Sequence, residues 1–178
     1  MVTNNFKAFL KTVLQAGYSA GKTLLPVKDV TGAAYYLYTI FGSSSFPYIA
    51  TPTMRFGNYG NEGVYVGTGN AAATENDYQL QSPITSGLTA STPSEQYGLD
   101  AAGNPYRELT YLITNNTAAD IVIKEIGFVQ VWSAGTTQNS TSNTPRKFLL
   151  DRTVLASPLT VPANSSVALK YTLKTIIS

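Results

Sequence analysis

The chain contains neither cysteine nor histidine. Without thiols it can form no disulfide and no cysteine-based zinc site, and the redox compartment is left open. Without imidazole it lacks the commonest metal ligand, the usual general base and the usual member of a catalytic triad. Chemistry that depends on either side chain is therefore excluded.

Charge is also scarce. Charged residues make up 12% of the chain, and the net charge is +2. Phosphate binding depends on clustered Lys and Arg, whereas the basic residues here are scattered, so we expect no nucleic-acid partner. A surface covered by Ser, Thr, Asn, Gln, Gly and Tyr does little to keep copies apart in solution, which suits a protein that works packed against its neighbours.

Long hydrophobic runs are missing. No run approaches the ~20 apolar residues of a membrane span, and Lys7 and Lys11 interrupt the apolar stretch near the start of the chain. We therefore expect no membrane partner and no targeting segment. A chain of 178 residues, 43% of them hydrophobic, is long enough for one sizeable core, or for one domain with a short arm.

The first residues predict an amphipathic helix over residues 5–16, which Asn4 or Asn5 caps and Gly17 ends. Its apolar positions recur at helical spacing: Phe6, Phe9, Leu10, Val13 and Leu14. We expect residues 1–22 to form a helical arm and residues 23–178 to form the main domain. Two interpretations stay open, because a helix this short must pack on something. It covers one end of its own core, or its stripe docks on another protein.

After this helix the sequence has the pattern of an all-β domain. Short runs rich in Tyr, Ile, Val and Thr alternate with clusters of Gly, Ser, Asn and Pro. The expected strands are Ala34 to Phe41, Ile49 to Phe56, Gly63 to Val66, Arg107 to Asn115, Asp120 to Trp132, Lys147 to Val154 and Val167 to Ile177. This number of strands predicts an antiparallel β-sandwich of jelly-roll type. The stretches Thr85 to Tyr106 and Ser133 to Pro145 read as long polar loops.

The stretch around Gly67 and Gly69 invites a nucleotide-binding interpretation, which its context does not support. A P-loop needs a Lys that is absent here. A dinucleotide fingerprint opens a helix between parallel strands, and Ala72 would stand in the place of its third glycine. We therefore expect no cofactor and interpret the two glycines as a tight turn at the end of a strand.

The acidic residues that follow do not form a recognisable metal or catalytic motif. Glu62, Glu75 and Asp77 lack the spacing of a calcium loop, so no metal site is predicted, although a divalent ion in this loop stays an open question. A glycosidase needs two carboxylates that face each other across a cleft, and a sequence cannot show that. No residue is predicted to be catalytic.

A different pair of charges is more informative. Glu125 stands among Ile, Val and Phe in one expected strand, and Arg152 stands in a similarly apolar strand. A charge in such a setting usually has a partner. We predict that Glu125 and Arg152 form a partly buried structural ion pair that fixes strand register. The alternative, in which both side chains point outward into solvent, stays open.

Three stretches together resemble a known group of proteins. They are "VYVGTGNAAATENDYQLQSPI" (Val64 to Ile84), "RELTYLITNNTAADIVIKEIGF" (Arg107 to Phe128) and "FLLDRTVLASPLTVPANSSVALKYTL" (Phe148 to Leu173). This succession is similar to small structural proteins of tailed bacteriophages, such as head decoration, head-fibre and tail components. The likeness covers about residues 63–178, and it implies a virion structural role in which Glu125 and Arg152 define the fold and do not catalyse.

The expected function is therefore assembly within a virion. The helical stripe would attach the protein to a capsid or tail subunit, and the β domain would associate with copies of itself, with a trimer as the expected oligomer. A tail or neck component is an alternative position. A carbohydrate- or receptor-binding module is a rival, with Tyr35 to Tyr38, Tyr59, Tyr97, Tyr106 and Trp132 as candidate contacts. An enzyme acting through paired acids is a third possibility.

Overall fold

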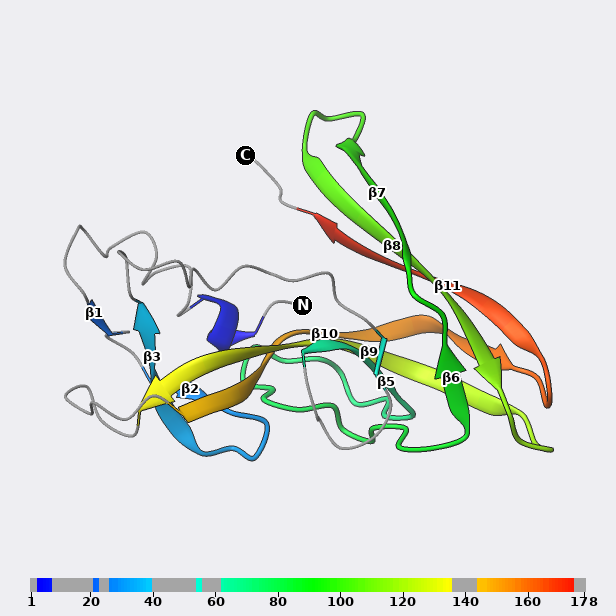
Figure 1. The fold of residues 1–178 in the computed structure, drawn as a ribbon, viewed down its shortest axis with the longest axis horizontal. Helices are drawn as coiled ribbons and strands as arrows, with labels where there is room; N and C mark the ends of the chain where they lie inside the picture. Colours follow the sequence, from blue (N-terminus) through cyan, green and yellow to red (C-terminus); the bar gives the residue numbers. More distant parts are fainter. Residues whose placement is uncertain are drawn as a thin grey trace. The chain divides into compact units, whose positions relative to one another are not determined.

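The computed structural model describes residues 3–7, 21–22, 26–39, 54–55, 62–135 and 144–174 (Figure 1). The predicted all-β class is confirmed, and the described strands fall into two sheets, as a β-sandwich requires. The chain divides into two compact units. The first contains Met1–Thr85 and Ile123–Pro158, and the second contains Ser86–Val122 and Leu159–Ser178.

The first unit is organised around a seven-stranded sheet in which β9 is central. The strands of this sheet are β1 (Gly21–Lys22), β2 (Val27–Lys28), β3 (Ala34–Thr39), β4 (Met54–Arg55), β5 (Gly63–Gly67), β9 (Ile121–Gly135) and β10 (Thr144–Val161). The beginning of β9, before Ile123, and the end of β10, after Pro158, belong to the second unit. The main path runs β1-β3-β9-β5-β4, with β10 also paired to β9 and β2 to β3. The β4–β5 pair is parallel, whereas β3 and β5 lie antiparallel to β9.

The second unit contains a smaller antiparallel sheet built on β8 (Pro105–Asn115). Strand β11 (Ser166–Lys174) pairs along one edge of β8, from Thr114 to Tyr106. Strands β6 (Leu88–Ala90) and β7 (Ser94–Leu99) pair with successive parts of β8. Every second residue of β8 from Leu109 to Asn115 is buried, so one face of this sheet is covered.

Most of the strands expected from the sequence are present. Strands β5, β8, β9, β10 and β11 overlap the expected ranges, and β3 and β4 do so as far as their residues are described. The expected loop from Thr85 to Tyr106 is different, because it contains β6 and β7. Their side chains are mostly polar, exposed or half-buried, and a strand with little burial has no apolar run to reveal it.

The core of the first unit lies against both faces of β5 and β9, since all five residues of β5 are buried. Tyr65, Leu80, Val129 and Leu149 form one cluster of buried side chains, against which Val30 packs. The Trp132 and Phe148 rings stack with their centroids 5.9 Å apart. Each fully buried large apolar side chain stabilises the fold by about 1.5–3 kcal/mol, so this cluster is a major source of stability.

The start of the chain is fastened to the first unit by hydrogen bonds. Residues 4–7 are helical, and the Thr3 carbonyl, instead of one at Asn4 or Asn5, accepts the first helical bond, from the Lys7 N–H at 3.2 Å. The buried Thr3 hydroxyl donates to the Leu149 carbonyl at 2.7 Å. The remainder of the predicted helix over residues 5–16, and of the predicted arm over residues 1–22, lies largely outside the described residues.

Asn5 explains why this first turn is held so firmly. Its side-chain amide donates to the Lys28 carbonyl at 2.7 Å, and its oxygen accepts the Lys28 N–H at 2.9 Å. The same amide also donates to the Leu149 carbonyl at 3.1 Å. The Asn5 side chain therefore hydrogen-bonds to the backbone of β2 as a neighbouring strand would, and it links β2 to β10. Residues 3–7 are therefore part of the body of the first unit, whereas the apolar positions of the predicted stripe after Phe6 lie outside the described residues.

Two hairpin loops share one aspartate-based design. Asp29 accepts the N–H groups of Thr31 and Ala33 at 2.9 and 3.1 Å. Asp100 accepts those of Ala102 and Asn104 at 2.9 and 2.8 Å. Each loop turns through a glycine in the left-handed region, at φ +86° for Gly32 and +80° for Gly103, where other residues are strained. These Asp-x-x-Gly loops connect β2 to β3 and β7 to β8.

Candidate functional site

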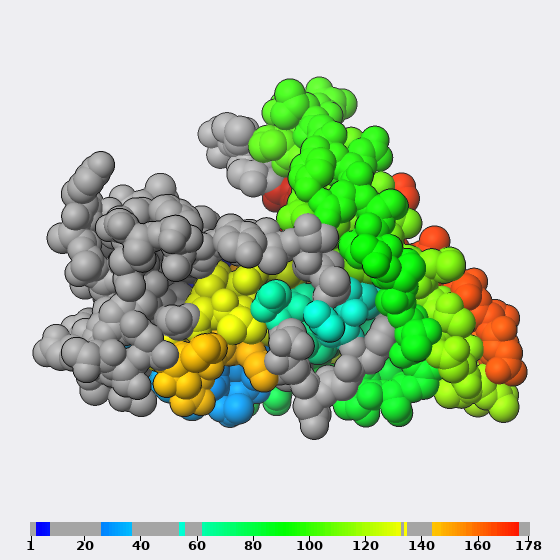
Figure 2. Space-filling view, in the orientation of Figure 1, coloured from blue at the N-terminus to red at the C-terminus, as the bar shows by residue number. Residues whose placement is uncertain are grey.

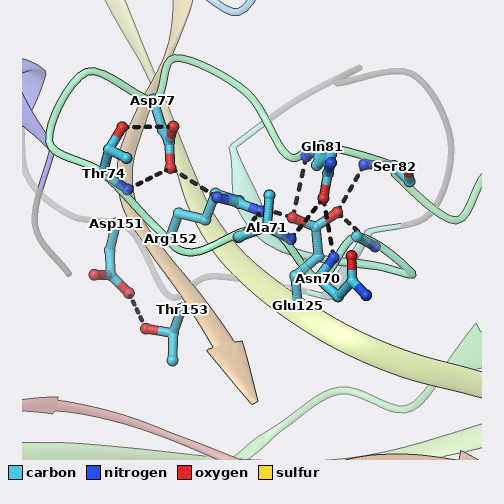
Figure 3. Close-up of polar contacts among 11 residues, drawn as sticks. Asn70, Ala71, Thr74, Asp77, Gln81, Ser82, Glu125, Asp151, Arg152 and Thr153 are labelled. Carbon is cyan, nitrogen blue, oxygen red and sulfur yellow. Dashed lines mark hydrogen bonds and ion pairs between the residues drawn. The ribbon is translucent and has the colours of Figure 1, made fainter. Parts of the chain in front are cut away.

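Three charged side chains meet inside the first unit (Figure 3). Glu125 comes from β9, Arg152 from β10 and Asp77 from the segment between β5 and β6. Arg152 Nε donates to Glu125 Oε2 at 2.8 Å, and Arg152 Nη1 donates to Asp77 Oδ2 at 2.8 Å. One guanidinium thus bonds to two carboxylates, and we call these three residues the acid–arginine centre.

The Glu125 carboxylate is completely enclosed, with 0% of the residue exposed. Its Oε1 accepts the backbone N–H groups of Gly69 at 3.1 Å and Ser82 at 2.7 Å. Its Oε2 accepts the Gln81 N–H at 3.0 Å in addition to the Arg152 bond. Four donors therefore surround one buried anion, which is the number that a desolvated carboxylate needs to compensate for lost water.

The two glycines of the Val-Gly-Thr-Gly stretch are required by this carboxylate. A Cβ at Gly67 would lie 2.4 Å from Glu125 Oε1, and one at Gly69 would lie 2.5 Å from the same oxygen. Any side chain at either position would displace the acid. The predicted tight turn therefore does not fully explain why glycine stands at these two positions. The glycines let the backbone approach the Glu125 carboxylate, an anion of the protein itself, closely.

The segment from Gly67 to Ser82 is folded around the centre by further polar contacts. The Gln81 side-chain oxygen accepts the N–H groups of Asn70 and Ala71, both at 2.9 Å. Arg152 Nη2 donates to the Ala71 carbonyl at 3.1 Å. The Thr68 N–H donates to the Ser82 carbonyl at 2.8 Å. These bonds join the two ends of the segment, and Figure 3 shows it wrapped around Glu125 and Arg152.

The charges of the centre are set by opposing effects. Burial raises the pKa of Asp77, but hydrogen bonds from the Thr74 N–H, the Arg152 guanidinium and the Thr74 hydroxyl outweigh it, so the pKa is lowered from its ordinary 3.8. Burial lowers the pKa of Arg152, but hydrogen bonds to Asp77 and Glu125 outweigh it and raise the pKa. Both groups therefore stay ionised at neutral pH.

The structure brings together the two residues of the predicted ion pair. Glu125 and Arg152 are in contact, and they are fully buried where the sequence suggested partial burial. Sequence reasoning missed the third member, Asp77, which it considered as a metal or catalytic acid. A signal was present in Thr74-x-x-Asp77, since Thr74 N–H and hydroxyl both donate to Asp77 at 2.9 Å.

The other candidates lie elsewhere. Phe6 is half-buried in the described first turn, whereas Phe9, Leu10, Val13 and Leu14 lie outside the described residues. Glu75 forms an exposed ion pair with Lys7. Across the described ranges, no three acids lie close enough together to hold a metal ion. Within the same ranges, no helix is long and apolar enough to span a membrane.

This arrangement is suited to holding structure. A general acid or nucleophile must reach substrate with a lone pair or a proton, whereas both Glu125 oxygens are already filled by backbone N–H groups and Arg152. Asp77 likewise accepts bonds from Thr74 and Arg152. The ion pairs and hydrogen bonds of the centre connect β9, β10 and the segment between β5 and β6.

Comparison with known proteins adds no relative. No family model, curated protein or solved structure matches this chain. The resemblance to bacteriophage structural proteins therefore stays an expectation drawn from short motifs. The role of the chain has to be inferred from the residues themselves, and the acid–arginine centre is their most specialised arrangement.

Replacing Glu125 by Gln should strongly destabilise the first unit. The amide would carry no charge opposite Arg152, and its NH₂ group would face N–H donors. Breaking a buried pair in this way costs about 3–5 kcal/mol. The matched control is Glu75→Gln, which removes an exposed pair with Lys7 and should cost at most about 1 kcal/mol. Urea unfolding measures both, and equal midpoints for the two variants would contradict a structural role for Glu125.

The lowered pKa of Asp77 predicts a specific loss of stability in acid. Because the folded pKa lies below the unfolded one, Asp77 stabilises the fold above about pH 4 and loses this effect as pH falls through the folded value. The difference in unfolding free energy between wild type and Asp77→Asn should therefore shrink below about pH 4. Asp100, whose pKa is lowered chiefly by Lys174, titrates in both proteins and cancels. A difference that stays constant with pH would refute the assignment.

Proposed function

We propose that this chain is a structural protein of a bacteriophage virion, a head decoration or head-fibre component that attaches to the capsid and associates with copies of itself. The supporting observation is the closed acid–arginine centre. The ion pairs and hydrogen bonds of this centre hold β9, β10 and the Gly67–Ser82 segment in place, and Glu125 within it is 0% exposed. A chain without Cys or His that uses its buried acids in this way is better equipped for assembly than for turnover.

Attachment through the N-terminal segment needs a revised boundary. Thr3 and Asn5 are buried in the first unit and bonded to β2 and β10, so these residues anchor the segment to its own body. The proposed capsid contact then consists of Phe9, Leu10, Val13 and Leu14. Burial of these side chains contributes about 25 cal/mol per Å² of apolar area, and several copies held together would add avidity.

Self-association is supported by the surface of the second unit. Tyr97 and Leu99 lie two residues apart on one face of its sheet, and they are exposed at 66% and 69%. Apolar side chains that gather on one face mark an interaction surface more often than scattered ones do. The low charge of the chain, 12% of residues, opposes association only weakly. A tail or neck position would use the same contacts.

Replacing Leu10 and Leu14 together by Glu should leave a folded protein that no longer joins the particle. Each burial lost removes about 1.5–3 kcal/mol from the contact, so occupancy should fall at least about tenfold. The double variant is preferable to deletion of residues 1–20, which would remove Thr3 and Asn5 and leave Leu149 and Lys28 without their partners. Quantitative gels of purified particles measure the occupancy.

The control is Lys11→Glu, which adds a negative charge within the expected helix but outside its apolar stripe. It should assemble at close to wild-type occupancy. If the Leu10→Glu, Leu14→Glu double variant also assembles normally, the N-terminal contact is wrong.

A glycan- or receptor-binding module is the second candidate, and Tyr97 is the observation that favours it. Of the aromatic residues considered for this role, Trp132 is buried and Tyr35 and Tyr106 are half-buried, whereas Tyr97 exposes 66% of its surface. The Arg107 guanidinium lies 5.5 Å from its ring centroid, so an aromatic face and polar groups lie together. Glycan-array binding that disappears in Tyr97→Ala would favour this role, and an array without any signal would count against it.

A further inference from the structure

Three consecutive residues between β5 and β6 connect two parts of the first unit. Asp77 bonds to Arg152 of β10, with 2.8 Å between the guanidinium nitrogen and the carboxylate oxygen, and is thus a member of the acid–arginine centre. Glu75 and Asn76, the two residues before it, bond instead to the start of the chain, residues 3–7. The centre and the first turn therefore meet in one short stretch.

The first turn contacts this stretch through three bonds. The Asn4 N–H donates to the Glu75 carbonyl at 2.7 Å, and the Asn4 side-chain amide donates to Asn76 Oδ1 at 3.0 Å. The Lys7 ammonium forms an ion pair with the Glu75 carboxylate. Both side-chain contacts lie at the surface, so they can be removed without disturbing the core.

Asp77 also fixes the shape of the stretch. Its carboxylate accepts the N–H and the hydroxyl of Thr74, both at 2.9 Å, and its own N–H donates back to the Thr74 carbonyl at 3.2 Å. These bonds close a four-residue turn, part of which Figure 3 shows beside Arg152, and Glu75 and Asn76 are its central residues. The guanidinium that holds the Asp77 carboxylate therefore also sets the position of the groups that bind the first turn.

The first turn is bonded directly to β10 as well. The Thr3 N–H donates to the Leu150 carbonyl at 2.9 Å, and the buried Thr3 hydroxyl donates to the Leu149 carbonyl at 2.7 Å. Arg152 follows these residues on the same strand. A closed set of contacts thus runs from Arg152 through Asp77 to the first turn, and from there back to β10.

The surface under the first turn is held together independently of the acid–arginine centre. Just after β2, the Val30 N–H donates to the Lys147 carbonyl of β10 at 2.9 Å. Figure 2 shows the blue residues of β2 and its loop next to the orange start of β10. Asn5 bonds to Lys28 and to Leu149, one on each strand. The first turn consequently has two attachments, one to β2 and β10 and one to the turn that the centre positions.

We propose that the acid–arginine centre positions the start of the chain, and that Asp77 is the positioning residue. Without its bond to Arg152, the turn that carries Glu75 and Asn76 loses its fixed place on β10. The first turn then keeps only its attachment to β2 and β10, and it opens more often. The proposed capsid contact begins at Phe9, shortly after the first turn, so the centre also positions that contact. This consequence for attachment rests on the proposed function, whereas the coupling within the first unit does not.

Native-state hydrogen exchange of the full chain measures this coupling, because local opening exposes an amide to exchange. In Asp77→Ala, the amides of Thr3 and Asn4 should exchange at least about tenfold faster than in the wild type, since the turn loses hydrogen bonds to a charged group. The matched control is Asp100→Ala in the second unit, because Asp100 also accepts two loop N–H groups and pairs with a lysine. The control should leave both amides at their wild-type rates. Unchanged rates in Asp77→Ala would overturn the proposal.

A general loss of stability would also speed up exchange, and Val64→Ala separates the two effects. Val64 is fully buried in β5, so its truncation leaves a cavity that destabilises the whole unit. The amides of the β5–β9 ladder should then exchange faster, whereas those of Thr3 and Asn4 should keep their wild-type rates. If Val64→Ala accelerates Thr3 and Asn4 as much as Asp77→Ala does, the first turn opens only with the whole unit, and positioning by Asp77 is wrong.

The reverse experiment removes only exposed contacts, so the protein should stay folded. Coupling between two sites is reciprocal. Asn4→Ala combined with Lys7→Ala should therefore speed up exchange at the amides of the Thr74–Asp77 turn, by about threefold for two surface contacts. The matched control is Asn116→Ala combined with Lys170→Ala, which removes an exposed asparagine bond and an exposed lysine pair in the second unit. Equal exchange at the turn in both double variants would contradict the coupling.

Particle occupancy connects the coupling to the proposed function. Asp77→Ala should reduce occupancy more than Val64→Ala does, because only the change at Asp77 releases the first turn. If exchange shows the coupling and occupancy is unchanged, the N-terminal capsid contact is wrong, while the positioning of the first turn by Asp77 stands. If occupancy falls without any change in exchange at Thr3 and Asn4, the coupling is wrong.

Discussion

The first unit depends on one constraint, which is that a carboxylate removed from water must have its oxygens filled. Glu125 lies within the central strand β9 and has no exposed surface. An unpaired charge in this position would cost several kcal/mol. The protein satisfies it with three backbone N–H groups and one guanidinium. The positions of the Gly67–Ser82 segment, of Arg152 on β10 and of Asp77 all follow from that requirement.

The same requirement links the fold to the proposed role. A segment that supplies backbone donors to a buried anion cannot rearrange without exposing that anion, so the acid–arginine centre makes this part of the first unit rigid. The first turn of the chain bonds to Glu75 and Asn76 within this segment, as well as to β2 and β10. A rigid body to which residues 3–7 are fastened fits the proposed role as a subunit of a larger assembly.

Much of this fold could be predicted from the sequence because burial leaves a visible pattern. Strands β5 and β9 are apolar runs, and a charge within such a run, as at Glu125 or Arg152, predicts a partner. Other parts of the fold and of the centre could not be predicted from the sequence, for physical reasons. Strand β7 lies at a sheet edge with little burial, so its sequence resembles a loop. Gly67 and Gly69 contact an acid that lies far along the chain, and no local pattern connects them. The Asp-x-x-Gly loops at Asp29 and Asp100 were not predicted, although their turn chemistry is a local signal that the sequence carries.

Hydrogen exchange at the amides that bind Glu125 tests the central role of this carboxylate most directly. If the carboxylate holds the segment in place, the N–H groups of Gly69, Gln81 and Ser82 open when the unit unfolds as a whole. They should then exchange as slowly as the amides of the β5–β9 ladder. Exchange of these three amides as fast as that of exposed loop amides would show that the segment opens by itself, and that would contradict the account.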